Sequence, residues 1–236
     1  MKKLINTKKD FILTESLIKD SVNILARGQV RLAAPFMPEY KLASMYRKVG
    51  WDAVVLNFFK HGTQEMPAEK GISFLWRDAD TLYVCGFFED SDVFNTATKR
   101  NEKTWQTGDV MEFFFQAPGQ KEYYELHVTP SSATLELRIP GIENLGKIPF
   151  ESQLYYSGFF SCAERFDYPE CKGWIGLMAI SFKGLGIMDG KLDKARFSVC
   201  RYNYNKKWDV PEKSSTTIYL EGGFHQPHLW HEIVKL

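Results

Sequence analysis

Two neighbouring segments of the chain alternate apolar and polar side chains, and this pattern limits the fold more than any other feature. DVMEFFFQ (109–116) places Met111 and the phenylalanines two and four residues later on one face, and Glu112 on the other. EYYELHVT (122–129) alternates with the same period, and the link APGQK has the length of a hairpin connection. We therefore expect two antiparallel strands that lie side by side in one sheet.

Similar segments follow one another from Trp51 to the end of the chain. They are rich in aromatic and β-branched residues and are separated by turn sequences such as RDAD and TPSS. The expected strands span 51–59, 72–76, 81–88, 109–116, 122–129, 133–139, 155–166, 173–181, 195–204 and 231–236. Short links favour antiparallel hairpins over βαβ units, so we predict one all-β antiparallel sandwich over 51–236. Residues 1–50 are expected to form a partly helical extension packed on it, with a helix at 38–50.

Composition argues against some classes of partner. The 236 residues carry a formal charge of +1, which gives no reason to expect nucleic acid or an anionic membrane as a partner. No stretch has the apolar length needed to cross a bilayer. The opening MKKLINTKKDFILTESL has the basic start of a signal peptide, but polar residues break the apolar run that should follow. No export signal is therefore visible in this chain.

The cysteines of the chain, Cys85, Cys162, Cys171 and Cys200, lack the C-x-x-C spacing of a metal site. We expect buried free thiols, because an unpaired cysteine packs in a core as a small hydrophobic residue. A disulfide between Cys162 and Cys171 across a loop is the alternative, and the sequence leaves it open.

A polar strip is predicted on the outer face of the sheet. Alternation puts Glu112 on one strand, Glu125 and His127 on the next, and Arg138 of ATLELRI on a third, all on the same side. The simpler interpretation is the solvated face that an antiparallel sheet presents to water. However, Glu112 has only apolar neighbours on its own strand face, and an apolar surface with a few fixed polar groups is typical of small-molecule sites. Sugars suit such a surface, because aromatic rings cover their C–H faces while charged groups bond their hydroxyls.

Two other chemistries would use the same residues. Glu112 and Glu125 on neighbouring strands have about the separation of the two carboxylates of a retaining glycosidase, but the strip lacks the long loops that build a hydrolase cleft. Glu112, Glu125 and His127 could also hold a metal ion, although no spacing signature supports one. Both are weaker hypotheses than sugar binding.

Arg201 in RFSVCRYNY shares a strand face with Phe197 and Val199, so it is expected to point inward or toward a cleft. A buried guanidinium needs a carboxylate partner. Glu112 or Glu125 is the candidate, and in that case the carboxylate would be structural. This ion pair is the strongest rival to a sugar contact.

Several stretches stand in the order expected for one family. They read FLWRDADTLYVCGFFEDSDV (74–93), TWQTGDVMEFFFQAPGQKEYYELHVTPS (104–131), GWIGLMAISFKGLG (173–186), RFSVCRYNYN (196–205) and FHQPHLWHEI (224–233). Together they resemble carbohydrate-binding module family nine, in its branch of stand-alone proteins. The resemblance implies an immunoglobulin-like β-sandwich related to DOMON domains, which agrees with the strand pattern.

The resemblance also implies a sugar site. Members of the family hold sugars between two tryptophans, and Trp105 and Glu112 match the first tryptophan and its ligand-bonding glutamate, with one extra residue between them. Glu125 stands where the sugar binders carry an arginine. The candidates for the second aromatic residue are Trp208, Tyr219, Phe224 and Trp230. The expected carbohydrate-binding set is Trp105, Glu112, Glu125, His127, Arg201 and Trp208.

The family further implies structural calcium, and the acidic loop Glu89, Asp90 and Asp92 matches the place where it is expected. No organic cofactor is expected. The sequence thus predicts a non-catalytic carbohydrate-binding protein with a saccharide as its ligand. The family suggests an extracellular or periplasmic location, which the sequence itself leaves open.

Three alternatives to this function stay open. The first is a saccharide-acting enzyme that uses Glu112 and Glu125. The second is a sandwich that has lost sugar binding, with Glu112 in a structural ion pair. The third is a haem-binding DOMON-like domain. The last is disfavoured, because His127 and Met111, its candidate axial ligands, face opposite sides of their strands.

Overall fold

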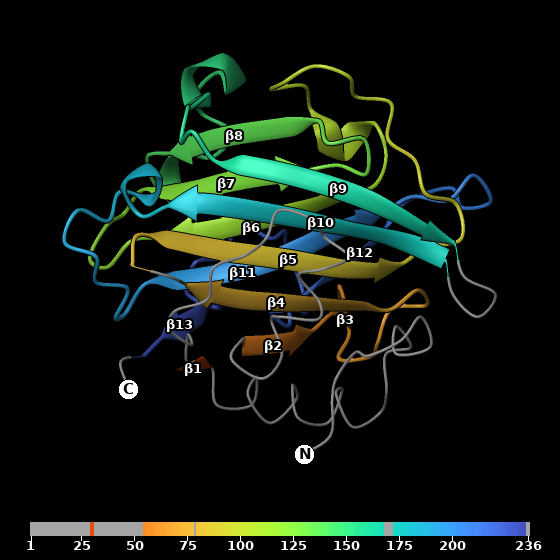
Figure 1. Ribbon diagram of the computed structural model, residues 1–236, viewed down its shortest axis with the longest axis horizontal. Helices are drawn as coiled ribbons and strands as arrows, with labels where there is room; N and C mark the ends of the chain where they lie inside the picture. Colours follow the sequence, from red (N-terminus) through yellow and green to blue (C-terminus); the bar gives the residue numbers. More distant parts are fainter. Residues whose placement is uncertain (1–28, 31–53, 78, 168–171, 235–236) are drawn as a thin grey trace.

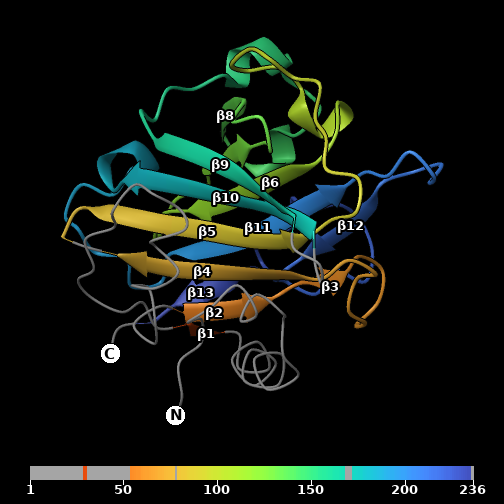
Figure 2. The ribbon, with the colours of Figure 1, turned by 45° about the vertical axis from the view of Figure 1, so that its right-hand side comes forward.

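The computed structural model describes residues 29–30, 54–77, 79–167 and 172–234, and these fold into two β-sheets that pack face to face (Figure 1). A second view, turned by 45°, shows the same packing of the two sheets (Figure 2). The expected all-β sandwich is therefore confirmed. The helix expected at 38–50 lies outside the described residues.

The smaller sheet has five strands among the described residues, in the order β2-β4-β5-β10-β9, and every pair is antiparallel. In Figure 1 it lies in front of the larger sheet. Its strands are β2 (Val54–Asn57), β4 (Gly71–Arg77), β5 (Thr81–Glu89), β9 (Phe160–Asp167) and β10 (Lys172–Ser181).

The larger sheet has eight strands among the described residues, in the order β1-β13-β11-β6-β7-β8, while β12 pairs with β11 and β3. All its pairs are antiparallel except β1 with β13. Its strands are β1 (Gln29–Val30), β3 (Phe59–Lys60), β6 (Val110–Gln116), β7 (Tyr123–Val128), β8 (Thr134–Ile139), β11 (Arg196–Asn203), β12 (Glu212–Ser215) and β13 (His231–Ile233).

Helical structure in the described part of the chain consists of short 3-10 turns. They are η3 (Thr104–Gln106), η4 (Ile142–Asn144), η5 (Phe150–Gln153) and η6 (Lys183–Leu185). None of the described helices is long and apolar enough to cross a membrane.

The main core fills the space between the sheets. Met111 and its alternate neighbours on β6 face it from the larger sheet, and Phe88 of β5 and Trp174 of β10 face it from the smaller one, with ring centroids 4.8 Å apart. Gly86 and Gly176 lie opposite each other on β5 and β10, and a Cβ at Gly86 would lie 2.5 Å from the sulfur of Met111. These glycines leave the space that the Met111 side chain fills.

Candidate functional site

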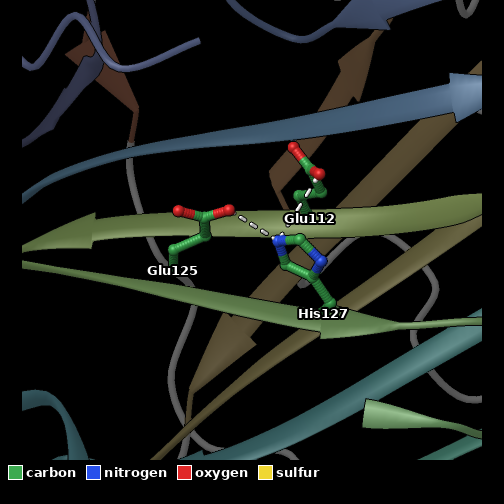
Figure 3. A group of neighbouring side chains, drawn as sticks. All are labelled: Glu112, Glu125 and His127. Carbon is green, nitrogen blue, oxygen red and sulfur yellow. Dashed lines mark hydrogen bonds and ion pairs between the residues drawn. The ribbon is translucent and has the colours of Figure 1, made fainter. Parts of the chain in front are cut away.

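Glu112, Glu125 and His127 meet on the outer face of the larger sheet, the face that points away from the smaller sheet. The register pairs Glu112 of β6 directly with His127 of β7, and Glu125 lies two residues before His127 on the same face. Figure 3 shows both carboxylates turned toward the same ring nitrogen. We call these three residues the carboxylate–histidine cluster. Their grouping follows from the strand alternation.

The prediction that Arg138 joins this strip is wrong. On β8 the residues opposite His127 and Glu125 are Leu135 and Leu137, so Arg138 points to the other side of the sheet. There its guanidinium binds the carboxylate of Glu122 at 2.6 Å. Alternation correctly separated the two faces of β8, but only the register with β7 decides which face adjoins the cluster.

The outer face is covered rather than solvated around the cluster. The exposed fraction is 2% for Glu112, 5% for Glu125 and 0% for His127. A second apolar group, which we call the outer cluster, packs over this face. Its buried members are Phe114, Tyr123, Leu135, Leu137, Ile139, Cys200, Tyr219, Phe224 and Trp230. Three of these come from the irregular segment 216–230, which is why strand periodicity did not reveal the cover.

His127 is the centre of the carboxylate–histidine cluster. Its Nε2 lies 2.8 Å from Oε1 of Glu125 and 3.4 Å from Oε1 of Glu112. Its Nδ1 lies 2.7 Å from the hydroxyl of Thr104, the first residue of η3. The edge of the Trp105 ring packs against the imidazole, with centroids 5.8 Å apart. Both ring nitrogens of His127 therefore have polar partners.

Burial and mutual contact shift the pKa values of all three groups. Burial raises the pKa of Glu112 to about 8, against the attraction of His127. Burial also acts to raise the pKa of Glu125, but His225 and His127 outweigh it and the net shift is downward. For His127, burial lowers the pKa, yet the two carboxylates outweigh it and raise it. Burial thus favours the protonated form of Glu112, while the two carboxylates favour the charged form of His127.

The cluster connects to the surface through His225. Nε2 of His225 lies 3.7 Å from the second carboxylate oxygen of Glu125, and its Nδ1 bonds the hydroxyl of Tyr123 at 2.9 Å. The side chain of His225 is 27% exposed. Neither His225 nor Thr104 was predicted as a site residue, although both stand in stretches that carry the resemblance, FHQPHLWHEI (224–233) and the stretch that begins TWQTGD at 104.

Arg201 points inward, as its strand face predicts, but its expected partner is wrong. The side chain lies between the two sheets and is fully buried, with its guanidinium 3.1 Å from the carboxylate of Asp90. It also donates to the backbone carbonyls of Glu69 and Glu89 and lies 4.9 Å from the Phe88 ring centroid. Arg201 therefore neutralises neither Glu112 nor Glu125, and it does not reach the outer face.

The acidic loop that was expected to hold calcium is engaged with protein groups. Asp90 binds Arg201, and Asp92 accepts hydrogen bonds from the backbone and side-chain nitrogens of Lys206. Glu89 accepts one from the backbone N–H of Lys70 at 3.1 Å. The three carboxylates thus bond to different partners, and calcium at this loop stays a prediction.

The two tryptophans of the expected sugar site lie at separate places. Trp105 is half-buried and packs on Phe150 at 5.9 Å between centroids, and its carbonyl accepts a hydrogen bond from the hydroxyl of Tyr204. Trp208 is 36% exposed and lines a pocket of about 500 Å³ at the β3–β12 edge of the larger sheet. The other lining residues are Lys60, His61, Ala68, Val210, Pro211, Glu212 and Lys213.

Contacts place this pocket beside the outer face that carries the cluster. Lys213 lies opposite Tyr202 in the β11–β12 pairing, and its ammonium group is 5.4 Å from the Tyr202 ring centroid. Tyr202 occupies the same strand face as Cys200, which lies opposite Glu112. The pocket that Trp208 lines also carries charged groups of both signs, namely Lys60, Lys213 and Glu212.

The described cysteines agree with the expectation that the thiols do not form disulfides. Cys85 and Cys200 are buried and Cys162 is half-buried, and none of the three is in a disulfide. Cys171 lies outside the described residues.

Comparison with solved structures finds similar folds among carbohydrate-binding modules and a candidate carbohydrate-binding protein. The chain is similar to the crystal structure of a candidate carbohydrate-binding protein from Bacteroides uniformis, with a TM-score of 0.61 and 14% identity over 87% of this chain and 97% of that one. No family model matches the sequence, and no curated protein matches it by sequence.

The chain also has the fold of family 9 carbohydrate-binding modules. A module of this family from Caldicellulosiruptor kristjanssonii in complex with cellotriose matches with a TM-score of 0.58 and 10% identity, over 87% of this chain and 92% of that one. A structure of a family 9 module from the same organism in complex with glucose matches with a TM-score of 0.55 and 9% identity, over 87% and 94%. The all-β sandwich that the sequence resemblance implied is confirmed.

Proposed function

We propose that the protein is a non-catalytic carbohydrate-binding protein that holds a saccharide at the β3–β12 edge of the larger sheet. The observation that carries this proposal is the pocket at Trp208. Its volume of about 500 Å³ falls within the range of small-molecule sites, roughly 300–1,000 Å³. The shared fold adds support, because modules with this fold hold cellotriose and glucose.

The lining of the pocket has the chemistry that a sugar requires. The exposed indole of Trp208 offers a flat apolar surface for the C–H face of a pyranose ring. Glu212 can accept hydrogen bonds from hydroxyl groups, while Lys60 and Lys213 can donate to hydroxyl oxygens. Trp105 is also partly exposed, but it does not line this pocket.

The geometry favours binding over hydrolysis. A glycosidase that used Glu112 and Glu125 would have to bring both carboxylates to the scissile bond. Both lie beneath the outer cluster, and His127 ties them to each other. We therefore assign the carboxylate–histidine cluster a role below the surface, where it supports Trp105 through the ring of His127.

The proposal is tested by titration of the purified protein with glucose, cellotriose and a panel of other mono- and oligosaccharides, followed by calorimetry and tryptophan fluorescence. Saturable binding in the micromolar to millimolar range is expected, which corresponds to about −4 to −8 kcal/mol. Trp208→Ala should weaken it at least about tenfold, since the loss of a central aromatic contact removes a binding hot spot. Trp105→Ala should weaken it less.

Tyr156→Ala is the matched control, because Tyr156 is an exposed aromatic residue on a different loop, with a cation–π contact to Arg100. The Tyr156→Ala variant should bind saccharides with the same affinity as the wild type. If no saccharide in the panel binds saturably, the proposed function is wrong. If binding survives Trp208→Ala unchanged, the proposed place of the site is wrong.

A further inference from the structure

The carboxylate–histidine cluster has a feature that saccharide binding does not use. One ligand atom from each of Glu112, Glu125 and His127 lies within 4.8 Å of the other two, and all three residues are buried (Figure 3). Two oxygens and one imidazole nitrogen thus converge on one small region. We propose that this cluster binds a divalent transition-metal ion.

The charge of the cluster fits a doubly charged cation. A metal ion binds deprotonated ligands, so it would displace the protons from Glu112 and His127. Glu112 and Glu125 then place two negative charges where solvent scarcely reaches. Buried carboxylates require a partner of opposite charge or a metal ion. Lys213 acts on Glu112 electrostatically, yet its ammonium group sits over the Tyr202 ring, and the ion pairs of the described residues include none between Lys213 and Glu112. A divalent ion would balance both carboxylates at once.

Thr104 holds the histidine in the orientation that a metal ligand needs. Metal-bound histidines usually donate the N–H of their second ring nitrogen to a fixed acceptor, and this leaves the lone pair of the first nitrogen for the metal. Here Nδ1 of His127 lies 2.7 Å from the Thr104 hydroxyl, and Nε2 faces the two carboxylates. On the far side, His225 lies 3.7 Å from the other oxygen of Glu125.

Glu112 is the ligand that is most available to a metal. Its side chain is only 3% exposed, and its contact with Nε2 of His127 at 3.4 Å is an ion pair with a nitrogen that already bonds Glu125 at 2.8 Å. Among the residues that the structure describes, no other side chain or backbone N–H donates a hydrogen bond to Glu112. Glu112 is thus a buried acceptor without a hydrogen-bond donor of its own, and it points toward Glu125 and His127. This feature distinguishes the cluster from an ordinary ion-pair network, in which buried acceptors are hydrogen-bonded.

The distances fit a small metal ion. Around tetrahedral zinc, with bonds of about 2.0–2.1 Å, neighbouring ligand atoms lie about 3.3 Å apart. The separation of Nε2 from the Glu112 oxygen is already 3.4 Å, whereas that from the Glu125 oxygen is 2.8 Å and must open by about half an ångström. One nitrogen with two carboxylates suits zinc, manganese or iron(II) better than calcium, which prefers six to eight oxygens.

The test uses the untagged full chain after removal of metal by a chelator. Calorimetric titration with zinc chloride should show one ion per chain. Cobalt(II) should then give a visible ligand-field absorption band and quench the fluorescence of Trp105, whose ring lies 5.8 Å from that of His127. Addition of one equivalent of zinc should abolish the cobalt band.

Variants locate the ion. Glu112→Gln and His127→Gln should each weaken zinc binding about 100-fold or more, since each removes a ligand, and Thr104→Val should weaken it about 10- to 100-fold by freeing the imidazole. Glu112→Gln is the most informative of the three, because a neutral amide matches the size of the protonated acid and the variant should fold. His231→Gln is the matched control, since it removes a buried histidine of the same sheet that bonds a backbone carbonyl.

The proposal fails if the wild type binds no stoichiometric zinc or cobalt up to about 1 mM, a concentration that corresponds to only about −4 kcal/mol of affinity. It also fails if binding persists in both Glu112→Gln and His127→Gln, which would show that the ion sits elsewhere. The cobalt spectrum is recorded on the wild type, so this test does not depend on whether the variants fold. Because the pocket at Trp208 shares no residue with the cluster, either proposal can fail without the other.

Discussion

Arg201 shows how a guanidinium is accommodated between the two sheets. It is fully buried, and its donors reach the carboxylate of Asp90 and the carbonyls of Glu69 and Glu89. Burial raises the pKa of Asp90 and outweighs the attraction of Arg201, so the ion pair only partly offsets the loss of water. The pair therefore joins β11 to the end of β5. Removal of one partner should destabilise the protein far more than removal of both.

We expect Arg201→Met to lower the free energy of unfolding by about 3–5 kcal/mol, because it leaves a buried carboxylate unpaired. The double variant with Asp90→Asn should recover part of this loss. Guanidinium unfolding curves would measure both. Arg196 lies on the same strand as Arg201 and forms a partly exposed ion pair with Glu232 of β13. Arg196→Met should change the free energy of unfolding by less than about 1 kcal/mol. Equal effects of the Arg201 and Arg196 substitutions would contradict this account.

His231 should make stability depend on pH. Its Nε2–H donates to the carbonyl of Thr216, and burial lowers its pKa to about 4 from an ordinary value near 6.5. Between these two values the unfolded chain binds a proton that the folded chain does not, so stability falls as the pH falls. The contribution of this residue between pH 7 and pH 4.5 is about 2 kcal/mol.

The measurement compares denaturant unfolding of the wild type and His231→Gln at pH 7 and pH 4.5. Other groups titrate in the same range, but their contribution is common to both proteins and cancels in the difference. The variant should lose about 2 kcal/mol less than the wild type over this interval. Identical losses in the two proteins would mean that His231 accepts its proton without unfolding.

At the scale of elements, alternation and turn chemistry predicted most strands within a few residues. They predicted β6, β7 and β8 from a period of two, and β4, β5, β10 and β11 from aromatic and β-branched residues between turn sequences. β12 was missed because its sequence, EKSS, has no apolar alternation and is a strand only through its pairing with β11 and β3. The strand expected at 155–166 begins only at Phe160, since Tyr155–Phe159 form a loop.

The close approach of β10 to β5 depends on Gly173. It lies opposite Glu89 at the start of β10, and a Cβ there would collide with the backbone carbonyl oxygen of Phe88 and lie 2.7 Å from the Phe166 ring. Because a backbone atom cannot turn away as a side chain can, Gly173→Ala should lower the free energy of unfolding by about 2 kcal/mol or more. Thermal and urea unfolding would measure the loss.

Gly223→Ala is the control for this substitution, because a Cβ at Gly223 would meet no atom within 4 Å. Its effect should stay within about 0.5 kcal/mol of the wild type. A Gly173→Ala variant as stable as Gly223→Ala would show that β10 can shift away from β5 at little cost.

At the scale of the whole molecule, the larger sheet is covered on both faces. The main core lies on one side, and the outer cluster lies on the other. Periodicity predicted the first and grouped Glu112, Glu125 and His127 on the second. It did not predict the cover, because residues 216–230 are irregular and pack on the sheet through contacts far apart in the sequence, which leave no local pattern. The sequence thus predicted correctly that these residues share one face of the sheet, but not that this face is buried around them.

This layering predicts a gradient of local stability. Every residue of β6 except the last is buried, whereas β9 is the edge strand of the smaller sheet and most of its residues are partly or fully exposed. Amides of β6 should therefore exchange with solvent only when the whole protein unfolds, while those of β9 should exchange through local opening. We expect β9 to exchange at least about 100-fold faster, since its opening exposes much less apolar surface.

Hydrogen–deuterium exchange followed by mass spectrometry would resolve peptides from the two strands. Low concentrations of guanidinium should speed exchange in β6, because global unfolding exposes a large surface, and should leave β9 nearly unchanged. If β9 proves as protected as β6 and equally sensitive to denaturant, the two sheets open as one cooperative unit, and the outer cluster adds no separate layer of stability.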